Sequence, residues 1–231
     1  SVTVKFHGEN AVYTSNKDYF IRAYTCARYG LYGIVKRIPN FATVFSSAKI
    51  LTAKMQSLTS INYVVCYSFP LTDISFANLL ADPAVPLRTL ISVYLQVIFA
   101  IVFAHKHVLF AHNMLFAANV KLSSYAPVFS INYSERSLLC FNYIAVICNY
   151  GHAQFSHISE THSIVHCPPN IHTGINLKPH ESSDIYTFTV NCYSLIVNLV
   201  KRTAQTNPSY DEIYLRQRIF SEFLQFFFTI T

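Results

Sequence analysis

The side chains best suited to metal binding or nucleophilic chemistry gather in one stretch of the sequence, between residues 152 and 180. It contains His152, His157, His162, His166, Cys167, His172 and His180. Zinc accepts histidine and cysteine ligands, so the composition is that of a metal site. The stretch lacks the C-x-x-C and H-E-x-x-H spacings of such sites, and no third group orients Cys167 and His172 as a nucleophilic pair. We therefore expect an irregular, solvated segment that holds no metal.

A second group of chemically capable residues follows the most apolar run of the chain. Residues 105–122 read HKHVLFAHNMLFAANVKL, with His112 seven residues before Asn119 and a β-like run after it. This pattern resembles the catalytic loop of protein kinases, which is His-Arg-Asp-Leu followed by four residues and Asn. The tripeptide His112-Asn113-Met114 stands where the family has His-Arg-Asp.

Four further segments resemble kinase motifs and occur in the order of the family. They are Gly33–Lys36 for the Val-Ala-Ile-Lys strand, Leu58–Val64 for the join after the C-helix, Val146–Gly151 for the strand that enters Asp-Phe-Gly, and Ser183–Phe188 for the start of the F-helix. The resemblance covers about residues 8–200, and the 30-residue interval from Asn119 to Asn149 is long for a kinase. Divergent kinase-like proteins of large DNA viruses have a similar insert, which suggests a viral origin.

The resemblance implies a bilobal α+β fold, with a small β-rich N-lobe and a mainly helical, shortened C-lobe. In that fold Lys36 would stand where kinases contact phosphate, and Asn119 where they hold the second metal. Asn149 would replace the metal-binding Asp. His112 is structural in active kinases, so its presence indicates the fold and not the chemistry.

The positions of the carboxylates argue against kinase activity. The chain has 11 Asp and Glu residues, and none lies at 19–72, 83–134 or 136–159. Phosphoryl transfer needs an Asp base, an Asp that binds magnesium and a C-helix Glu that holds the strand Lys. Met114 cannot accept a proton, and Asn149 is a neutral, poorer ligand for magnesium. The sequence therefore predicts a pseudokinase, not an enzyme, in which His112-Asn113-Met114 is a degenerate motif.

Nucleotide binding is the alternative that the sequence leaves open. Lys36 and Asn119 remain, so a nucleotide-binding regulator with ATP as its ligand is one reading. An atypical serine/threonine kinase is another, with Glu135 or Glu160 as relocated groups. However, Lys36 would serve equally as a solvated lysine at a strand end, and Asn119 as a turn cap. A loop with the single glycine Gly8 cannot approach phosphates closely, so we expect no cofactor.

The elements that must position these residues run in an order of strands first and helices later. Short β-rich stretches predict strands at 2–6, 11–14, 19–25, 31–38 and 61–69, and then at 120–122 and 145–148. Apolar spacing predicts helices at 43–58, 86–105, 183–201 and 211–228. This is an α+β arrangement, which we divide into a β-rich N-lobe with one helix (1–70), an interlobe linker (71–85) and a helical C-lobe (86–231).

Composition indicates a chain that other proteins cover. Hydrophobic residues make up 52% and charged residues 12%, about half the usual charged share, and the chain has 16 Tyr and 19 Phe. We expect partners that are other protein chains of an assembly, such as a virus particle. The stripe formed by Ile219, Phe220, Phe223, Leu224 and Phe226–Phe228 is the best candidate surface. The same stripe could equally complete the helical lobe.

Charge, cysteine placement and hydropathy indicate which partners and which environment to expect. The net charge of +6 is spread without a basic block, so nucleic-acid binding is not indicated. The 6 cysteines form no C-x-x-C pair and most sit in apolar runs, which is typical of a reducing environment, intracellular or in a virion. The apolar run Leu90–Ala104 is shorter than the roughly 20 residues of a membrane span, so we expect a buried core helix.

Overall fold

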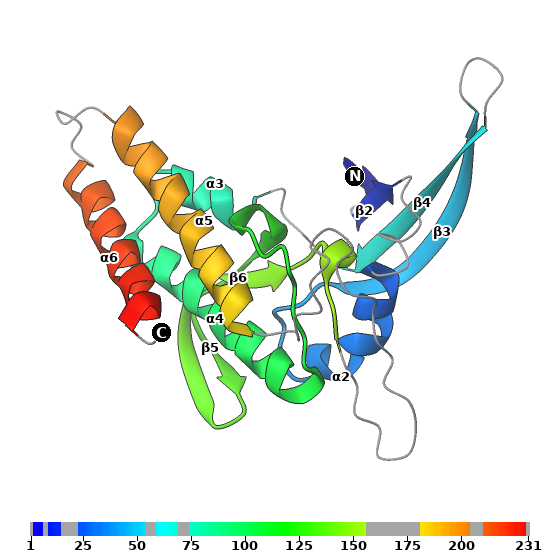
Figure 1. Ribbon diagram of the computed structural model, residues 1–231, viewed down its shortest axis with the longest axis horizontal. Coiled ribbons are helices and arrows are strands. Elements are labelled where there is room, and N and C mark those ends of the chain that lie inside the picture. The colour runs from blue at the N-terminus through cyan, green and yellow to red at the C-terminus, as the bar shows by residue number, and fades with distance from the viewer. Residues whose placement is uncertain are drawn as a thin grey trace.

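The computed structural model of the chain describes residues 2–6, 9–14, 23–53, 59–68, 74–155, 181–203 and 210–229. Within these residues the fold is a mixed α+β arrangement, which agrees with the predicted class. A four-stranded sheet lies at one end, helices lie at the other, and a long two-stranded hairpin lies beside the central helix (Figure 1).

The first sheet is antiparallel throughout, with the strand order β1-β2-β4-β3. Its strands are β1 (Val2–Phe6), β2 (Glu9–Thr14), β3 (Thr43–Ala53) and β4 (Thr59–Ser68). The strands predicted at 2–6, 11–14 and 61–69 are confirmed. Strand β4 lies inside the sheet because it pairs with β2 on one side and β3 on the other.

The helix predicted at 43–58 is wrong, because residues 43–53 form strand β3 and residues 54–58 lie outside the described residues. Its apolar residues come in adjacent pairs, Val44-Phe45 and Ile50-Leu51, which fit a helix or a strand with two covered faces. The segment is also rich in β-branched residues, which favour extended backbone. Strand β4 offers an edge along which this segment can pair, and that pairing decides the conformation.

The strands predicted at 19–25 and 31–38 are wrong, because the described residues of these stretches are helical at 23–25 and 32–35 and form bends, turns or irregular backbone at 31 and 36–38. Residues 23–30 are helical and end in the π-helical turn η1 (Cys26–Gly30), which the short helix α2 (Tyr32–Val35) follows. The buried apolar residues recur with helical spacing: Ala23, Cys26, Ala27, Leu31, Ile34 and Ile38. This 3–4 spacing is a better guide here than the β-rich composition, because one covered face specifies a helix.

The second sheet is a hairpin of β5 (Val120–Tyr133) and β6 (Arg136–Ile147). It confirms the strands predicted at 120–122 and 145–148 in position, but the two strands contain 14 and 12 residues and are much longer than expected. The hairpin turns at Ser134, whose φ of 56° lies in the left-handed region. It occupies most of the long interval between Asn119 and Asn149.

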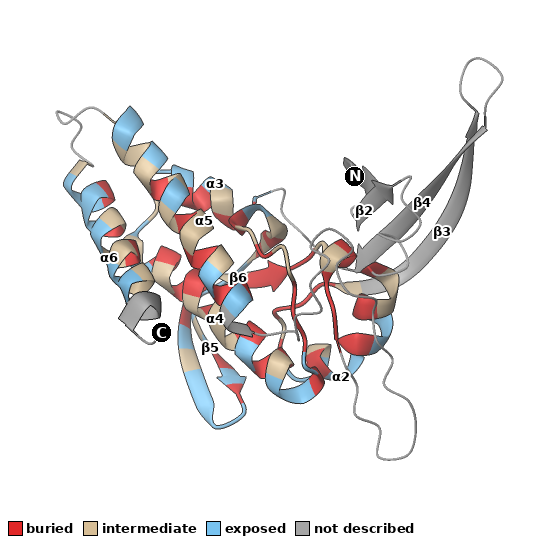
Figure 2. Cartoon of the chain, viewed as in Figure 1, coloured by how far each residue is buried: buried red, intermediate tan, exposed pale blue. Residues whose placement is uncertain are grey.

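Three long helices confirm the remaining predictions: α4 (Leu87–Val108), α5 (Glu181–Arg202) and α6 (Tyr210–Thr229). The sequence did not predict the short helix α3 (Phe76–Ala81), which starts with a capping box of Ser75 and Asn78. Helix α4 packs on β6 and α5, and the buried residues gather along it (Figure 2). The core therefore sits between α4, the hairpin and the C-terminal helices.

Helix α4 is, among the described helices, the one that is long and apolar enough to cross a membrane. Its most apolar window is 61% buried inside the protein. Its interior polar residues also have partners in β6, because Ser92 accepts from the Phe141 amide at 3.0 Å and Gln96 donates to the Tyr143 carbonyl at 2.9 Å. These are the features of the predicted core helix.

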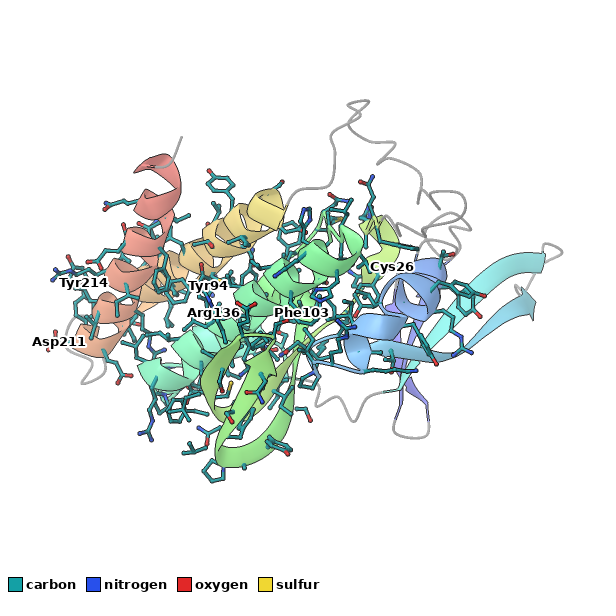
Figure 3. The ribbon with its side chains drawn as sticks, turned by 90° about the horizontal axis from the view of Figure 1, so that it is seen from below. Cys26, Tyr94, Phe103, Arg136, Asp211 and Tyr214 are labelled. Atoms are coloured by element: carbon teal, nitrogen blue, oxygen red, sulfur yellow. The ribbon has the colours of Figure 1, made fainter. Side chains whose placement is uncertain are left out.

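The C-terminal helix α6 completes the helical part of the molecule. Phe220 is fully buried, and the rings of Phe220 and Phe223 lie 5.2 and 5.0 Å from the ring of Tyr94 on α4 (Tyr94 is labelled in Figure 3). Buried Arg216 donates to the carbonyl oxygens of the α3–α4 connection, at Asp82, Pro83 and Val85. The apolar stripe of α6 therefore packs inward as far as Phe223, and the side chains of residues 226–228 lie outside the described part.

Candidate functional site

The degenerate loop begins where α4 ends. Leu109 caps the helix in the left-handed region with φ 45°, and its N–H donates to the carbonyl of His105. Ala111 and Gln154 then pair through two backbone hydrogen bonds of 2.8 and 2.9 Å. The loop is thereby joined to the segment that follows Asn149.

His112 is fully buried, and both of its ring nitrogens have partners. Nε2 lies 2.9 Å from the carbonyl oxygen of Cys148, and Nδ1 lies 3.3 Å from the backbone nitrogen of Met114. Because a backbone N–H can only donate, Nδ1 accepts and Nε2–H donates, which defines a neutral imidazole. Burial lowers the pKa of His112 to about 4. These are the contacts of a residue that shapes the loop and not of a proton carrier.

Asp184, near the start of α5, holds the backbone of the same loop. Its carboxylate accepts hydrogen bonds from the amides of His112 and Asn113, the latter at 2.7 Å. Burial raises the pKa of Asp184 to about 6, and the two hydrogen bonds oppose that shift. In the sequence Asp184 is recognisable only as part of a helix start, where an acidic residue is favoured by the helix dipole.

Asn119 and Asn149 lie side by side. The Asn149 side-chain amide donates to Oδ1 of Asn119 at 3.0 Å, and the Asn119 amide donates to the carbonyl of Met114 at 2.8 Å. Asn149 has a φ of 70°, a left-handed conformation in which Asn is enriched. The structure therefore brings His112, Asn119 and Asn149 to one place, as the order of the motifs predicts.

The chemistry available at this place is limited. Asn113 donates its side-chain amide to the carbonyl of His152 at 2.9 Å, and Met114 beside it is half-buried. Both oxygens of Asp184 face the loop backbone. No group of three or more His, Cys, Asp or Glu residues that could hold a metal occurs in the described part of the chain. Residues 156–180, with most of the predicted histidine cluster, lie outside it.

Lys36 does not stand on a strand, contrary to the prediction. It lies in the turn after α2, and its Nζ is 4.1 Å from the centre of the Tyr32 ring. The hydrogen bond and the charge of Lys36 lower the pKa of the Tyr32 hydroxyl. Both side chains are exposed, whereas Asn119 and Asn149 bond to each other. Lys36 is thus an exposed lysine in a turn, with its ammonium group over the Tyr32 ring.

Turn η1 covers the segment that follows Asn149. A Cβ atom added to Gly30 would lie 2.7 Å from the buried ring of Phe155, so the ring can pack this closely on the η1 backbone only because residue 30 is a glycine. The Tyr150 hydroxyl donates to the carbonyl of Ala42 at 3.0 Å, which adds a second link to the N-terminal half. These contacts fix the position of residues 150–155.

The site is therefore assembled from three distant parts of the chain: the loop after α4, the turn at Asn149 and the start of α5. Its polar atoms are used in holding these parts together. No family model and no curated protein matches the sequence.

Proposed function

We propose that this chain is a catalytically inactive protein kinase-like protein that acts as a structural or interaction element in a larger assembly. Strands β1–β4 with η1 and α2 would form the smaller lobe, and α3–α6 with the hairpin the larger one. The resemblance to kinase-like proteins of large DNA viruses favours a virus particle as the setting.

The kinase-like part of the proposal is supported by contacts between segments that are far apart in sequence. The carboxylate of Asp184 meets the backbone of His112 across 72 residues of sequence, and the His112 ring meets Cys148 across 36. Asn149 meets Asn119 across 30 residues. Each of these residues belongs to a segment that resembles a kinase motif, and accidental resemblances would have no reason to converge.

The observation that carries the inactive assignment is that, among the described residues, no carboxylate at this site is available for catalysis. Met114 stands in the position of the catalytic base and cannot take a proton from a hydroxyl group. The Asn119–Asn149 amide pair supplies no anionic oxygen for magnesium. Asp184 contacts the loop, and each of its carboxylate oxygens accepts a hydrogen bond from a backbone amide.

Nucleotide binding and phosphate transfer test this assignment directly. We expect no transfer of radiolabelled phosphate from ATP to the chain or to a generic protein substrate, and no rise in Tm with ATP and magnesium. Transfer that disappears in Asn119→Ala would overturn the proposal. A rise in Tm with ATP that Asn119→Ala abolishes, without any transfer, would replace it with the nucleotide-binding regulator.

The interaction part is supported by large apolar side chains on the hairpin. Tyr125, Val128 and Leu139 are 59%, 56% and 57% exposed. Val128 and Leu139 share one face of the hairpin, since Ser130 pairs with Leu139 and lies two residues from Val128. Cross-linking mass spectrometry on the native assembly should find partner chains on this hairpin. A chain that is a monodisperse monomer without cross-links would contradict the role.

A further inference from the structure

A groove of about 280 Å³ lies between α4 and the turn of the hairpin. Its lining is formed by Phe99, Val102, Phe103, Lys106, Tyr133, Ser134, Glu135 and Arg136. Phe103 on α4 and Arg136 at the hairpin turn mark its position (Figure 3). The groove therefore depends on the unusual length of the hairpin, which carries the turn to the C-terminal half of α4.

The floor of the groove is apolar and already shaped. The rings of Phe99 and Tyr133 stack with centres 5.4 Å apart, and the buried Tyr133 hydroxyl donates to Oδ1 of Asn40 at 2.7 Å. Phe103 is buried, but Val102 is 41% exposed. An apolar group placed here would remove Val102 from water without any rearrangement of the floor.

The rim of the groove carries more positive than negative charge. Lys106 and Arg136 are both exposed, and Glu135 is the only acidic residue among the described residues of the lining. No ion pair of Lys106, Glu135 or Arg136 occurs among the described residues. The two cations are thus available to an anionic partner, in a protein whose net charge is +6.

The other groove that we describe has a different character. It measures about 330 Å³ and lies between α5 and α6, where it is lined by Tyr193, Tyr214, Gln217, Arg218, Ser221, Glu222 and Gln225 (Tyr214 in Figure 3). Arg218 and Glu222 already form an ion pair of 3.3 Å. The described lining of this groove has no aliphatic side chain and no unbalanced charge, so it does not indicate which kind of ligand would bind.

We propose that the α4–hairpin groove binds a segment of a partner protein in which one apolar side chain is flanked by aspartate or glutamate. The apolar side chain would cover Val102 and Phe99, and the acidic residues would meet Lys106 and Arg136. This inference rests on the proposed interaction role and names a surface for it.

Three fluorescein-labelled decapeptides test the proposal by fluorescence anisotropy with the full chain. The first has a central Phe flanked by Glu and Asp, the second has Lys in place of every acid, and the third has Ser in place of Phe. We expect the first peptide to bind and the other two to bind at least tenfold more weakly. Binding of the first should weaken as salt is raised, because exposed charges are screened.

A charge-reversed protein locates the binding. Lys106→Glu combined with Arg136→Glu should weaken the first peptide about tenfold, since each exposed ion pair contributes little alone. The matched control is Lys201→Glu with Arg202→Glu, an equal charge change at exposed residues of α5, and it should leave binding unchanged. Circular dichroism establishes that both variants fold, and the salt dependence of the unmodified chain gives a result that needs no variant.

Several outcomes would overturn the inference. They are equal or tighter binding of the lysine peptide, equal weakening in the control variant, and no binding at all. Binding of 4-phenylbutyrate as tight as that of the acidic peptide would assign the groove to small carboxylates. The proposed function fails separately, through phosphate transfer or a monomer without partners. A chain that lacks activity and has partners, but does not bind the acidic peptide, loses only this surface.

Discussion

At the residue scale, His112 and Asp184 resist opposite changes of charge although they hold the same loop. The folded protein lowers the pKa of His112 from 6.5 to about 4, so the contribution of His112 to the stability of the protein is lost as the pH falls from 6.5 to 4. It raises the pKa of Asp184 from 3.8 to about 6, so the contribution of Asp184 to the stability of the protein is lost as the pH rises from 3.8 to 6. Between roughly pH 4 and 6 the two contributions nearly cancel.

Single substitutions should separate the two contributions. For His112→Gln, the free energy of unfolding relative to the unmodified chain should fall as pH rises from 4 to 6.5, by about 1.4 kcal/mol per pH unit where steepest. For Asp184→Asn, the free energy of unfolding relative to the unmodified chain should instead rise as the pH rises from 4 to 6. Urea denaturation at a series of pH values measures both. Difference curves that stay flat would show that neither group titrates in this window.

Leu109 is a second residue at which a single change is informative. A leucine in the left-handed region is strained, whereas a glycine is not. Leu109→Gly should therefore be more stable than Leu109→Ala by about 0.5–1 kcal/mol, after allowance for the more flexible unfolded chain of the glycine variant. The two variants lose the same leucine contacts beyond Cβ and differ by a single methyl group, so each is a control for the other. Equal stability by urea denaturation would mean that the strain is absent.

At the element scale, the packing of η1 on Phe155 depends on Gly30. Gly30→Ala should cost about 1–3 kcal/mol, because the new methyl group would lie within 3 Å of the ring. Gly33→Ala is the matched control in the neighbouring helix α2, where an added Cβ has nothing within 4 Å. That variant should be neutral or gain up to about 1 kcal/mol.

A double-mutant cycle tests whether the overlap with the Phe155 ring is the cause of the loss in Gly30→Ala. Phe155→Leu replaces the ring with a smaller side chain. Combined with Gly30→Ala, it should restore part of the stability that Gly30→Ala loses, because the two side chains then no longer overlap. Thermal unfolding of the four proteins measures this. Strictly additive losses would show that Gly30 does not act through Phe155.

At the scale of the whole molecule, one buried polar cluster joins three parts of the chain. Gln96 on α4 accepts from the Ala145 amide at 2.9 Å and donates to the Tyr143 carbonyl of β6. Asn40 donates to Gln96 at 3.3 Å and accepts from Tyr133. The cluster thus satisfies the outer edge of β6 and links it to the segment that leads into β3.

Removal of Gln96 should therefore loosen the molecule well beyond α4. Gln96→Ala leaves several buried groups without partners and should cost about 3 kcal/mol or more. Gln217→Ala, on the surface of α6, should change stability by less than about 0.5 kcal/mol. Hydrogen exchange should also be faster at the Ala145 amide in Gln96→Ala. A cost below about 1 kcal/mol, with unchanged exchange, would mean that the cluster contributes little.

Much of this molecule could be predicted from the sequence where the signal is local. Helices α4, α5 and α6 follow from apolar residues at a spacing of three and four, which specifies one covered face whatever the rest of the chain does. The lack of carboxylates within the loop and next to Asn149 is also a property of the sequence, since no Asp or Glu lies at 83–134 or 136–159. The order of the motifs predicted the meeting of His112, Asn119 and Asn149.

Only the tertiary structure decided the features that depend on distant partners. Residues 43–53 are a strand because β4 offers an edge to pair with, which outweighs an ambiguous apolar pattern. Lys36 lies in a turn and not on the predicted strand, because residues 23–38 bury apolar side chains at helical spacing. The role of Asp184 and the groove beside Val102 arise where segments far apart in sequence meet. Propensity acts within a few residues, whereas burial and pairing are settled between elements, and these set the site and its surroundings.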